Sequence, residues 1–520
     1  MVNVPTDFNA AIYFIDRHVP EGRGRKVAFE CGDEKVTYKQ LLERVNRVGN
    51  ALKRLEVRIE ERVALMLLDT PAFAYSFFGA IKIGAVAVPV NTLLKPPEYE
   101  YILNDCRARV LIISQELLPQ FKAIPRKKLR YLKHIIVSGK AARGMVSLEK
   151  LMAKSSTDLD AEATCKDDAA FWLYSSGSTG FPKGCVHLQH DMVVCSELYA
   201  QAVLKITERD RFFSVAKLFF AYGLGNGLYF PLSVGATSIL WPGSPSPPNV
   251  FATIERHKPT LFFSVPSNYA SLLAFQREGG RDFNLSTVRH AVSAGEALPA
   301  PIFFGFKERF NVEILDAIGS TEAAQMFIAN RPGAVRPGSS GQVLDGYEAR
   351  IVDENDEPLP DNEIGNLLIR GDSVCSQYWN QHEKTKDTIV GHWIRTGDKY
   401  YRDSDGYYWY VGRSDDMLKV KGMWVSPIEV ESALLEHPAV LEAAVIGLSN
   451  DNQLTRPAAY VVLKSHGAAG AALRASIQTH LAAKLVAYKC PEAIHFIREL
   501  PKTATGKIQR YKLRQLAAGK

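Results

Sequence analysis

The sequence has little cysteine and no long apolar run, and both absences limit what the chain can be. Its seven cysteines among 520 residues are scattered without a C-x-x-C pair. We therefore expect reduced thiols and a cytoplasmic protein, not a disulfide framework. No stretch reaches the roughly 18 consecutive apolar residues of a membrane span. Residues 1–18 lack a basic segment and carry Asp7, which is not typical of a secretory signal.

Neither sign of charge dominates. The chain has 63 Lys and Arg against 56 Asp and Glu, a net charge of +7. This balance permits an anionic ligand but does not predict a nucleic-acid partner. With 46% apolar residues, the chain can bury a sizeable core, and its length suggests roughly three to four structural units.

Three familiar motifs are also missing. Lys183 lies between Pro182 and Gly184, so the Gly-Lys-Ser/Thr end of a P-loop is not formed. No G-x-S-x-G nucleophile elbow occurs. The segment "YGLGNG" (222–227) is followed by Leu228, where a dinucleotide fingerprint needs its last glycine. The sequence therefore gives little support to P-loop, serine-hydrolase or nicotinamide chemistry.

What is present is the segment "FWLYSSGSTGFPKG" (171–184), an apolar run followed by small and hydroxyl residues and then a lysine. Glycines let successive amides face inward, hydroxyls donate hydrogen bonds, and Lys183 supplies charge. The segment therefore favours an anion cradle, most naturally for phosphate. The alternative is an ordinary surface turn, since the same residues are common in loops.

Short apolar runs alternate with amphipathic stretches along most of the chain. Residues 62–69, 85–91, 109–114 and 134–139 are predicted to be buried strands, and residues 37–55 an amphipathic helix. This alternation indicates α/β units with mixed or parallel sheets. After about Gly412 the pattern changes to that of a smaller α+β unit of about 100 residues.

The segment "LDAIGSTEAAQMF" (315–327) predicts a strand and a turn, followed by Ser320, Thr321 and Glu322. A hydroxyl beside a carboxylate can hold phosphate and Mg²⁺ together. The alternative is a helix cap, because Ser or Thr followed by Glu is common at helix starts.

Two later segments also contain candidate ligand-binding residues. In residues 392–422, Asp398 follows a Thr-Gly turn and could accept two ribose hydroxyls, and Arg413 could face a phosphate; the alternative is a β-turn aspartate among hairpins. In "PKTATGK" (501–507), Gly506 gives Lys507 room to reach two oxyanions at once. The alternative there is a solvated basic tail.

Together, and in this order, "SSGSTGFPKG", "SAGEALP", "IGSTE", "RTGD", "GRSDDMLKVKG" and "PKTATGK" resemble the adenylate-forming superfamily of acyl-CoA synthetases, adenylation domains and luciferases. The resemblance covers nearly the whole chain. Within the superfamily, "KLFFAYGLGN" and "DDMLKVKGMWVSPIEVE" are most similar to the benzoate-CoA ligase group. It implies a large N-terminal domain of stacked α/β sheets (1–414) and a small mobile α+β C-terminal domain (415–520).

The resemblance implies a role in nucleotide binding for several motif residues. Thr321 would contact the α-phosphate of ATP and Glu322 would bind Mg²⁺. Thr179 and Lys183 would contact the β- and γ-phosphates directly. The residues expected to bind the nucleotide are Ser175, Ser176, Gly177, Ser178, Thr179, Gly180 and Lys183 at the phosphates, Gly295, Glu296 and Asp316 around adenine, and Asp398 and Arg413 at the ribose.

The family also implies two half-reactions. Lys507 would bridge the substrate carboxylate and the α-phosphate during adenylation. A rotation at the hinge residue Asp415 would then withdraw Lys507 and bring Gly422 beside the tunnel for coenzyme A. Because the charge of Lys507 does the work, acetylation by a lysine acetyltransferase, reversed by a deacetylase, would act as a switch.

The expected acyl pocket is where the match to the family weakens. Benzoate ligases usually have Met-Leu-His-Ile after Ser-Thr-Glu, but this chain has Ala323, Ala324, Gln325 and Met326. Gln325 could donate to a ring hydroxyl or amino group, or hold the loop. The expected lining residues are Ala221, Tyr222, Gly319, Gln325 and Met326. Benzoate is the first expectation, followed by a substituted benzoate, a cyclic aliphatic acid, or an aryl-adenylating enzyme that loads a carrier protein.

Overall fold

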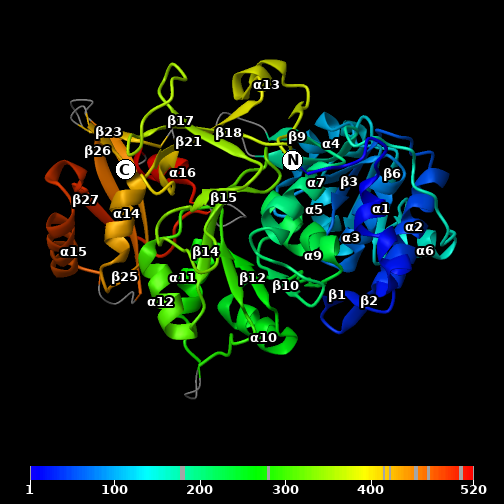
Figure 1. Cartoon of the computed structure of the whole chain (residues 1–520), viewed down its shortest axis with the longest axis horizontal. Coiled ribbons are helices and arrows are strands. Elements are labelled where there is room, and N and C mark those ends of the chain that lie inside the picture. The colour runs from blue at the N-terminus through cyan, green and yellow to red at the C-terminus, as the bar shows by residue number, and fades with distance from the viewer. Residues whose placement is uncertain are drawn as a thin grey trace.

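The chain folds around two large sheets in a computed structural model that describes residues 2–175, 182–277, 282–413, 416–420, 423–449, 455–464, 469–502 and 508–518 (Figure 1). The eight-stranded sheet has the order β19-β9-β8-β4-β3-β5-β6-β7. Its strands are β3 (Arg62–Met66), β4 (Val86–Pro89), β5 (Val110–Ser114), β6 (His134–Ser138), β7 (Val146–Ser147), β8 (Ala169–Ser175), β9 (Lys183–Leu188) and β19 (Gln377–Tyr378). All its pairings are parallel except β8–β9 and β9–β19.

The nine-stranded sheet has the order β16-β15-β14-β13-β12-β10-β11-β1-β2. Its strands are β1 (Val27–Cys31), β2 (Glu34–Thr37), β10 (Arg211–Ser214), β11 (Thr237–Ile239), β12 (Leu261–Ser264), β13 (His290–Ser293), β14 (Ile314–Gly319), β15 (Met326–Ala329) and β16 (Gln342–Val343). The central pairings are parallel, and the chain becomes antiparallel at β14–β15, where the Ser-Thr-Glu segment connects the two strands.

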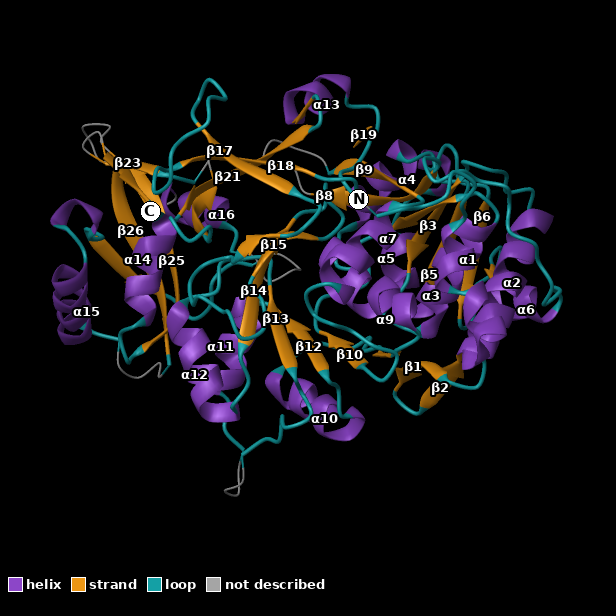
Figure 2. Ribbon diagram, viewed as in Figure 1, coloured by secondary structure: helices purple, strands orange, loops and turns teal. Residues whose placement is uncertain are grey.

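Three smaller sheets complete the strands. The five-stranded sheet contains β17 (Glu348–Val352), β18 (Gly365–Arg370), β20 (Ile389–Val390), β21 (Trp393–Arg402) and β22 (Tyr408–Arg413). Further along the chain are a two-stranded sheet, β23 (Leu418–Val420) and β24 (Met423–Val425), and a three-stranded sheet, β25 (Val440–Ser449), β26 (Thr455–Leu463) and β27 (Ala493–Phe496). Figure 2 shows these last two sheets at one end of the molecule, beside α14 and α15.

The helices cover the faces of these sheets. The α-helices are α1 (Ala10–Phe14), α2 (Tyr38–Arg54), α3 (Pro71–Lys82), α4 (Pro96–Asp105), α5 (Leu118–Lys122), α6 (Leu148–Ala153), α7 (Asp191–Cys195), α8 (Ala221–Leu224), α9 (Phe230–Val234), α10 (Pro247–His257), α11 (Pro266–Ala274), α12 (Ala300–Phe310), α13 (His382–Thr388), α14 (Pro427–Leu435), α15 (Ala471–Lys484) and α16 (Arg510–Ala518). Short 3₁₀ and π-helices join them at η1 (Asp16–His18), η2 (Val19–Arg23), η3 (Gln115–Leu117), η4 (Arg126–Lys128), η5 (Ser196–Gln201), η6 (Gly225–Tyr229) and η8 (Ala487–Lys489). Within the described residues, none of them is long and apolar enough to cross a bilayer.

Alternation along the strands shows how the layers stack. In β3, Val63 and Leu65 join one large apolar cluster, whereas Ala64 and Met66 join another on the opposite face of the sheet. The first cluster also contains residues of the nine-stranded sheet and of α3, whose twelve residues are all buried. Helix α3 therefore lies between the two sheets, while α4 and α5 cover one outer face and α10, α11 and α12 the other.

The predicted elements in the first part of the chain are confirmed: β3, β4, β5 and β6 lie within the four predicted strand segments, and α2 coincides with the predicted helix. A reciprocal bond pair between Thr37 and Gln40 caps the start of α2. In the later part of the chain, the described apolar side chains that are buried from Leu418 onward form two clusters of their own. The fold class is thus α/β, with a large unit followed by a smaller α+β unit.

Candidate active site

The Ser-Thr-Glu segment forms the connection between β14 and β15. Ser320 Oγ accepts a hydrogen bond from Ala323 N at 3.1 Å, and Ala324 has a φ of 59°. No helix begins here, so the helix-cap alternative is wrong. The serine instead closes a turn, which carries Thr321 and Glu322 between the two large sheets.

Glu322 is the centre of a buried polar cluster. Lys183 Nζ lies 3.2 Å from Glu322 Oε1, and both side chains are about 15% exposed. The Tyr378 hydroxyl accepts from Lys183 Nζ at 2.7 Å and donates to Glu322 Oε1 at 2.8 Å. Ser175 Oγ lies 3.4 Å from the same oxygen. Burial disfavours the ionised form of Glu322, but the Lys183 charge and the Tyr378 hydroxyl outweigh it and lower its pKa.

The elements explain why these side chains meet. Strands β8 and β9 are antiparallel and pair Ser175 with Lys183, so the ends of the glycine-rich segment lie side by side. Strand β19 adds to β9 and pairs Tyr378 with Cys185. Tyr378 was not predicted from the sequence, because the residues around it form no recognisable motif.

A second buried pair, His187 and Asp191, contacts the turn between β14 and β15. His187 Nδ1 is 2.7 Å from Asp191 Oδ2, and His187 Nε2 is 2.8 Å from Thr321 O. Because a carbonyl oxygen only accepts, Nε2 must carry a proton. The ring also stacks on Phe171, with centroids 4.9 Å apart. His187 therefore holds the backbone of Thr321, and the only sequence signal was a histidine and an aspartate four residues apart.

Two of the predicted adenine residues, Gly295 and Glu296, follow the end of β13, and the third, Asp316, lies in the neighbouring strand β14, where it pairs with Ser293. Gly295 has a φ of 93°, a conformation that favours glycine. Asp316 is buried, its Oδ2 accepts from Leu298 N at 3.3 Å, and burial raises its pKa well above the ordinary range. Glu296 Oε1 accepts from the backbone N–H of Ile508 at 2.9 Å, which joins this region to the C-terminal segment.

Asp398 and Arg413 face each other on paired strands. They are register partners in β21 and β22, and Arg413 Nη1 lies 3.1 Å from Asp398 Oδ1 and 2.9 Å from Thr396 O. Gly397, between Thr396 and Asp398 in the chain, has a φ of 75°. Asp398 is thus part of a strand, not an isolated β-turn.

The five predicted acyl-pocket residues come together around the turn between β14 and β15. Gln325 Nε2 donates to Ala221 O at 3.3 Å and to Tyr222 O at 3.1 Å. The Tyr222 hydroxyl lies 3.1 Å from the backbone carbonyls of both Ser264 and Val292, and burial raises its pKa well above the ordinary range. A side chain on Gly319 would collide with the Gln325 backbone, and Met326 is 1% exposed.

Several predicted residues lie outside the described part of the chain. They are Ser176, Gly177, Ser178, Thr179, Gly180, Asp415, Gly422 and Lys507. Three described residues close to them in sequence, Ser175, Lys183 and Ile508, contact residues of the candidate site.

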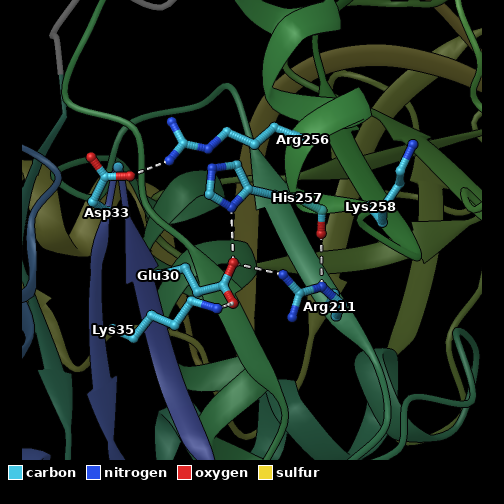
Figure 3. Close-up of a pocket in the computed structure, with 8 residues that line it drawn as sticks. Glu30, Asp33, Lys35, Arg211, Arg256, His257 and Lys258 are labelled. Carbon is cyan, nitrogen blue, oxygen red and sulfur yellow. Dashed lines mark hydrogen bonds and ion pairs between the residues drawn. The ribbon is translucent and has the colours of Figure 1, made fainter.

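A separate surface pocket of about 410 Å³ lies between β1, β2 and α10 (Figure 3). Its centre is Glu30, which accepts from His257 Nδ1 at 2.8 Å and from Arg211 Nη2 at 2.7 Å. None of the predicted site residues that the structure describes lines this pocket. Since its own cations already bind Glu30, we regard it as a structural junction between elements.

Comparison with known proteins adds the relationships of the chain. Residues 16–379 match the family model described as AMP-binding enzyme, and residues 429–507 match the AMP-binding enzyme C-terminal domain. A benzoate–CoA ligase of Thauera aromatica is 48% identical, with 99% of this chain and 97% of the relative covered.

Two solved structures are also similar. An anthranilate CoA ligase in complex with anthranoyl-AMP is 47% identical, with a TM-score of 0.96 and 99% of both chains covered. A benzoate CoA ligase from Burkholderia xenovorans LB400 is 44% identical, with a TM-score of 0.90 and coverage of 98% of this chain and 100% of the other.

Proposed function

The chain belongs to the AMP-binding enzyme family, and we propose that it is an AMP-forming acid–thiol ligase that joins an aromatic carboxylic acid, benzoate first, to coenzyme A. ATP and coenzyme A are the co-substrates, and AMP and pyrophosphate leave. The observation that carries this proposal is the 48% identity to a benzoate–CoA ligase over nearly the full length of both chains.

The chemistry explains the kind of site that is needed. A carboxylate is a poor acyl donor because its leaving group would be oxide. Its oxygen therefore attacks the α-phosphorus of ATP, the bond to the bridging oxygen breaks, and pyrophosphate leaves. The coenzyme A thiol then adds to the acyl carbon of the adenylate, loses its proton, and displaces AMP. No enzyme nucleophile is required, so the residues must neutralise charge and align two anions.

Lys183 and Glu322 fit the phosphate end of such a site. We assign the β- and γ-phosphates to Lys183 and the segment from Ser175 to Gly180, and the α-phosphate to Thr321. An ionised, largely buried carboxylate is a hard oxygen ligand, and Mg²⁺ commonly takes one or two of these together with substrate phosphates. The lowered pKa of Glu322 therefore fits the role of the protein ligand to Mg²⁺. When bound, Mg²⁺ would neutralise charge on the phosphates.

The nucleoside is assigned to the other carboxylates. Gly295, Glu296 and Asp316 would surround adenine, and Asp398 would accept the ribose hydroxyls with Arg413 beside it. The Arg413–Asp398 pair supports this assignment, because an arginine bonded to one carboxylate oxygen fixes the orientation of the group.

The C-terminal part is assigned to the change between half-reactions. We propose a boundary between residues 414 and 415, with Asp415 as the hinge, Lys507 as the adenylation lysine and Gly422 beside the coenzyme A tunnel. Both apolar clusters formed from Leu418 onward contain only residues of the C-terminal part. This supports a C-terminal unit that can rotate as a rigid body relative to the N-terminal unit. Acetylation of Lys507 would stop adenylation. The seven free cysteines are consistent with a reducing, cytoplasmic setting.

A substituted benzoate is the second candidate, because a solved relative holds anthranoyl-AMP, an aminobenzoyl adenylate. A cyclic aliphatic acid and a carrier-protein acceptor remain alternatives from the sequence. Acid-dependent ATP–pyrophosphate exchange without coenzyme A tests adenylation, with benzoate, aminobenzoates, hydroxybenzoates, cyclohexanecarboxylate and hexanoate as the panel. Thioester formation after addition of coenzyme A then tests the acceptor. Exchange no faster with any aromatic acid than with hexanoate would overturn the aromatic assignment.

A further inference from the structure

The side-chain amide of Gln325 is bonded at its nitrogen and unbonded at its oxygen. Nε2 lies 3.3 Å from Ala221 O and 3.1 Å from Tyr222 O. Both partners are carbonyl oxygens that only accept, so the nitrogen must face them and the amide cannot be flipped. The side chain is 2% exposed, and Oε1 has no hydrogen-bond partner among the described residues.

Such an oxygen is unusual in a folded protein. Buried polar atoms are nearly always hydrogen-bonded, because a buried acceptor without a donor loses its hydration and gains nothing in return. The residues around Gln325 keep the amide in place nonetheless. A side chain on Gly225 would overlap the amide, so the glycine makes room for it. Two backbone carbonyls then hold its nitrogen, and the oxygen is left as an acceptor.

This acceptor lies among the residues predicted to line the acyl pocket of the proposed function. Gln325 directly contacts Ala221 and Tyr222, which open α8, and its backbone lies against Gly319 at the end of β14. The Tyr222 hydroxyl is fixed on β12 and β13, so this side chain has little freedom to turn and donate to Gln325. No described donor bonds Oε1, so this oxygen is available to a donor group that enters the acyl site.

We propose that Gln325 determines specificity by accepting a hydrogen bond from an O–H or N–H group on the ring of the acid. The substrate class is then a hydroxy- or aminobenzoate in preference to unsubstituted benzoate. This inference rests on the proposed function and, among its aromatic acids, places a substituted benzoate ahead of benzoate. The sequence left two roles open for Gln325, donating to a ring group or holding the loop. The amide nitrogen is already bonded to the α8 carbonyls, so the role proposed here is that of an acceptor.

Matched acid pairs test the proposal. A methyl group is close in size to an amino group but cannot donate, so each aminobenzoate is compared with the methylbenzoate substituted at the same ring position, and hydroxybenzoates are measured beside them. The readout is the ratio of kcat/KM values in ATP–pyrophosphate exchange. At one ring position we expect the donor-bearing acid to exceed its methyl partner by about tenfold or more, because a site that pairs a substrate donor rejects the analogue lacking it.

Gln325→Met keeps the length of the side chain and removes the acceptor. We expect it to bring the ratio close to one while the methylbenzoate is still used. Gln189→Met is the matched control, since Gln189 is also fully buried and its Oε1 accepts from Ala10 N at 2.9 Å, among residues outside the acyl site. That variant should leave the ratio unchanged. Gly225→Ala, whose methyl group displaces the amide, is a second test should Gln325→Met fail to fold.

The outcomes distinguish failure of this inference from failure of the proposed function. A wild-type ratio near one at every ring position overturns the inference, as expected if a buried water bonds Oε1 instead. A preference that survives both Gln325→Met and Gly225→Ala overturns the assignment to Gln325. If benzoate and methylbenzoates support exchange without a donor advantage, only this inference fails. If no acid supports exchange, the proposed function fails with it.

Discussion

Lys183 and Glu322 form an ion pair that joins the two large sheets, with Nζ and Oε1 3.2 Å apart. Lys183 begins β9 of the eight-stranded sheet, and Glu322 lies in the turn between β14 and β15 of the nine-stranded sheet. Both side chains are mostly shielded from water, so each charge needs the other as its partner unless a ligand takes that place. A phosphate for Lys183 and Mg²⁺ for Glu322 would be such replacements.

Glu322→Gln should therefore abolish most of the adenylation. The substitution keeps the shape of the side chain but removes its charge, and we expect ATP–pyrophosphate exchange to fall by about 10²-fold or more. Glu313→Gln is the control, because Glu313 forms a comparable pair with Lys307 that is exposed on the surface. Exchange within a few-fold of wild type in Glu322→Gln would contradict the assignment.

His187 is expected to act by positioning Thr321. His187→Phe keeps the aromatic stack on Phe171 but loses the donor to Thr321 O, and we expect kcat to fall by roughly tenfold with little change in the KM for ATP. His187→Gln keeps a side-chain N–H and should recover part of the loss. Both variants can lower the melting temperature, because the buried Asp191 loses its His187 partner. A purely structural role would leave the kcat of the folded enzyme unchanged in both.

Lys507→Ala should affect the two half-reactions unequally. A lysine that bridges the carboxylate and the α-phosphate is needed for adenylation but not for attack of the thiol on a finished adenylate. We expect exchange to fall at least about 10²-fold, while thioester formation from supplied acyl-AMP and coenzyme A stays within a few-fold. Stoichiometric acetylation of Lys507 should reproduce the first effect. Equal losses in both half-reactions would refute this division.

Glu30 makes stability depend on pH at the junction in Figure 3. Burial disfavours its ionised form, but hydrogen bonds from His257 and Arg211 outweigh burial and lower its pKa. A carboxyl whose pKa is lowered by folding stabilises the protein above its unfolded pKa of about 4.3, and this contribution is lost as the pH falls through the folded value.

Glu30→Gln should accordingly lower the melting temperature by roughly 1–3 °C at pH 7. The difference from wild type should shrink as the pH falls below about 4. Thermal unfolding of both proteins across this pH range measures the effect, with ATP–pyrophosphate exchange at pH 7 as a check that the site is unaffected. A difference that is constant with pH would contradict a role for the charge.

Much of the fold was predictable because it depends on local pattern. The buried strands β3 to β6 are short apolar runs, and α2 has apolar residues at helical spacing and a capping pair at its start. The ordered motifs also identified Lys183 and Glu322 as candidates. Their residue types suit phosphate and Mg²⁺, and the order of the motifs along the chain favoured this interpretation over a surface turn or a helix cap.

The remaining contacts depend on pairings that are distant in sequence. Tyr378 meets Lys183 only because the two-residue strand β19 adds to β9, nearly two hundred positions earlier in the chain. The bond from His187 to Thr321 O likewise links the two sheets. For Gln325 the residue type was noted, but the use of its nitrogen by two backbone carbonyls depends on where α8 begins. No local pattern contains that information.

The hydrogen bond from Ile508 to Glu296 limits which substitutions the sequence can accept during evolution. The donor is a main-chain N–H, so nearly every residue type at position 508 would preserve it, and proline alone would remove it. The acceptor, by contrast, is a side-chain oxygen of Glu296, so it is lost with any residue type that does not place an oxygen there. The contact that attaches the C-terminal segment therefore tolerates most substitutions at position 508 but few at position 296. Selection on this contact should fall on Glu296.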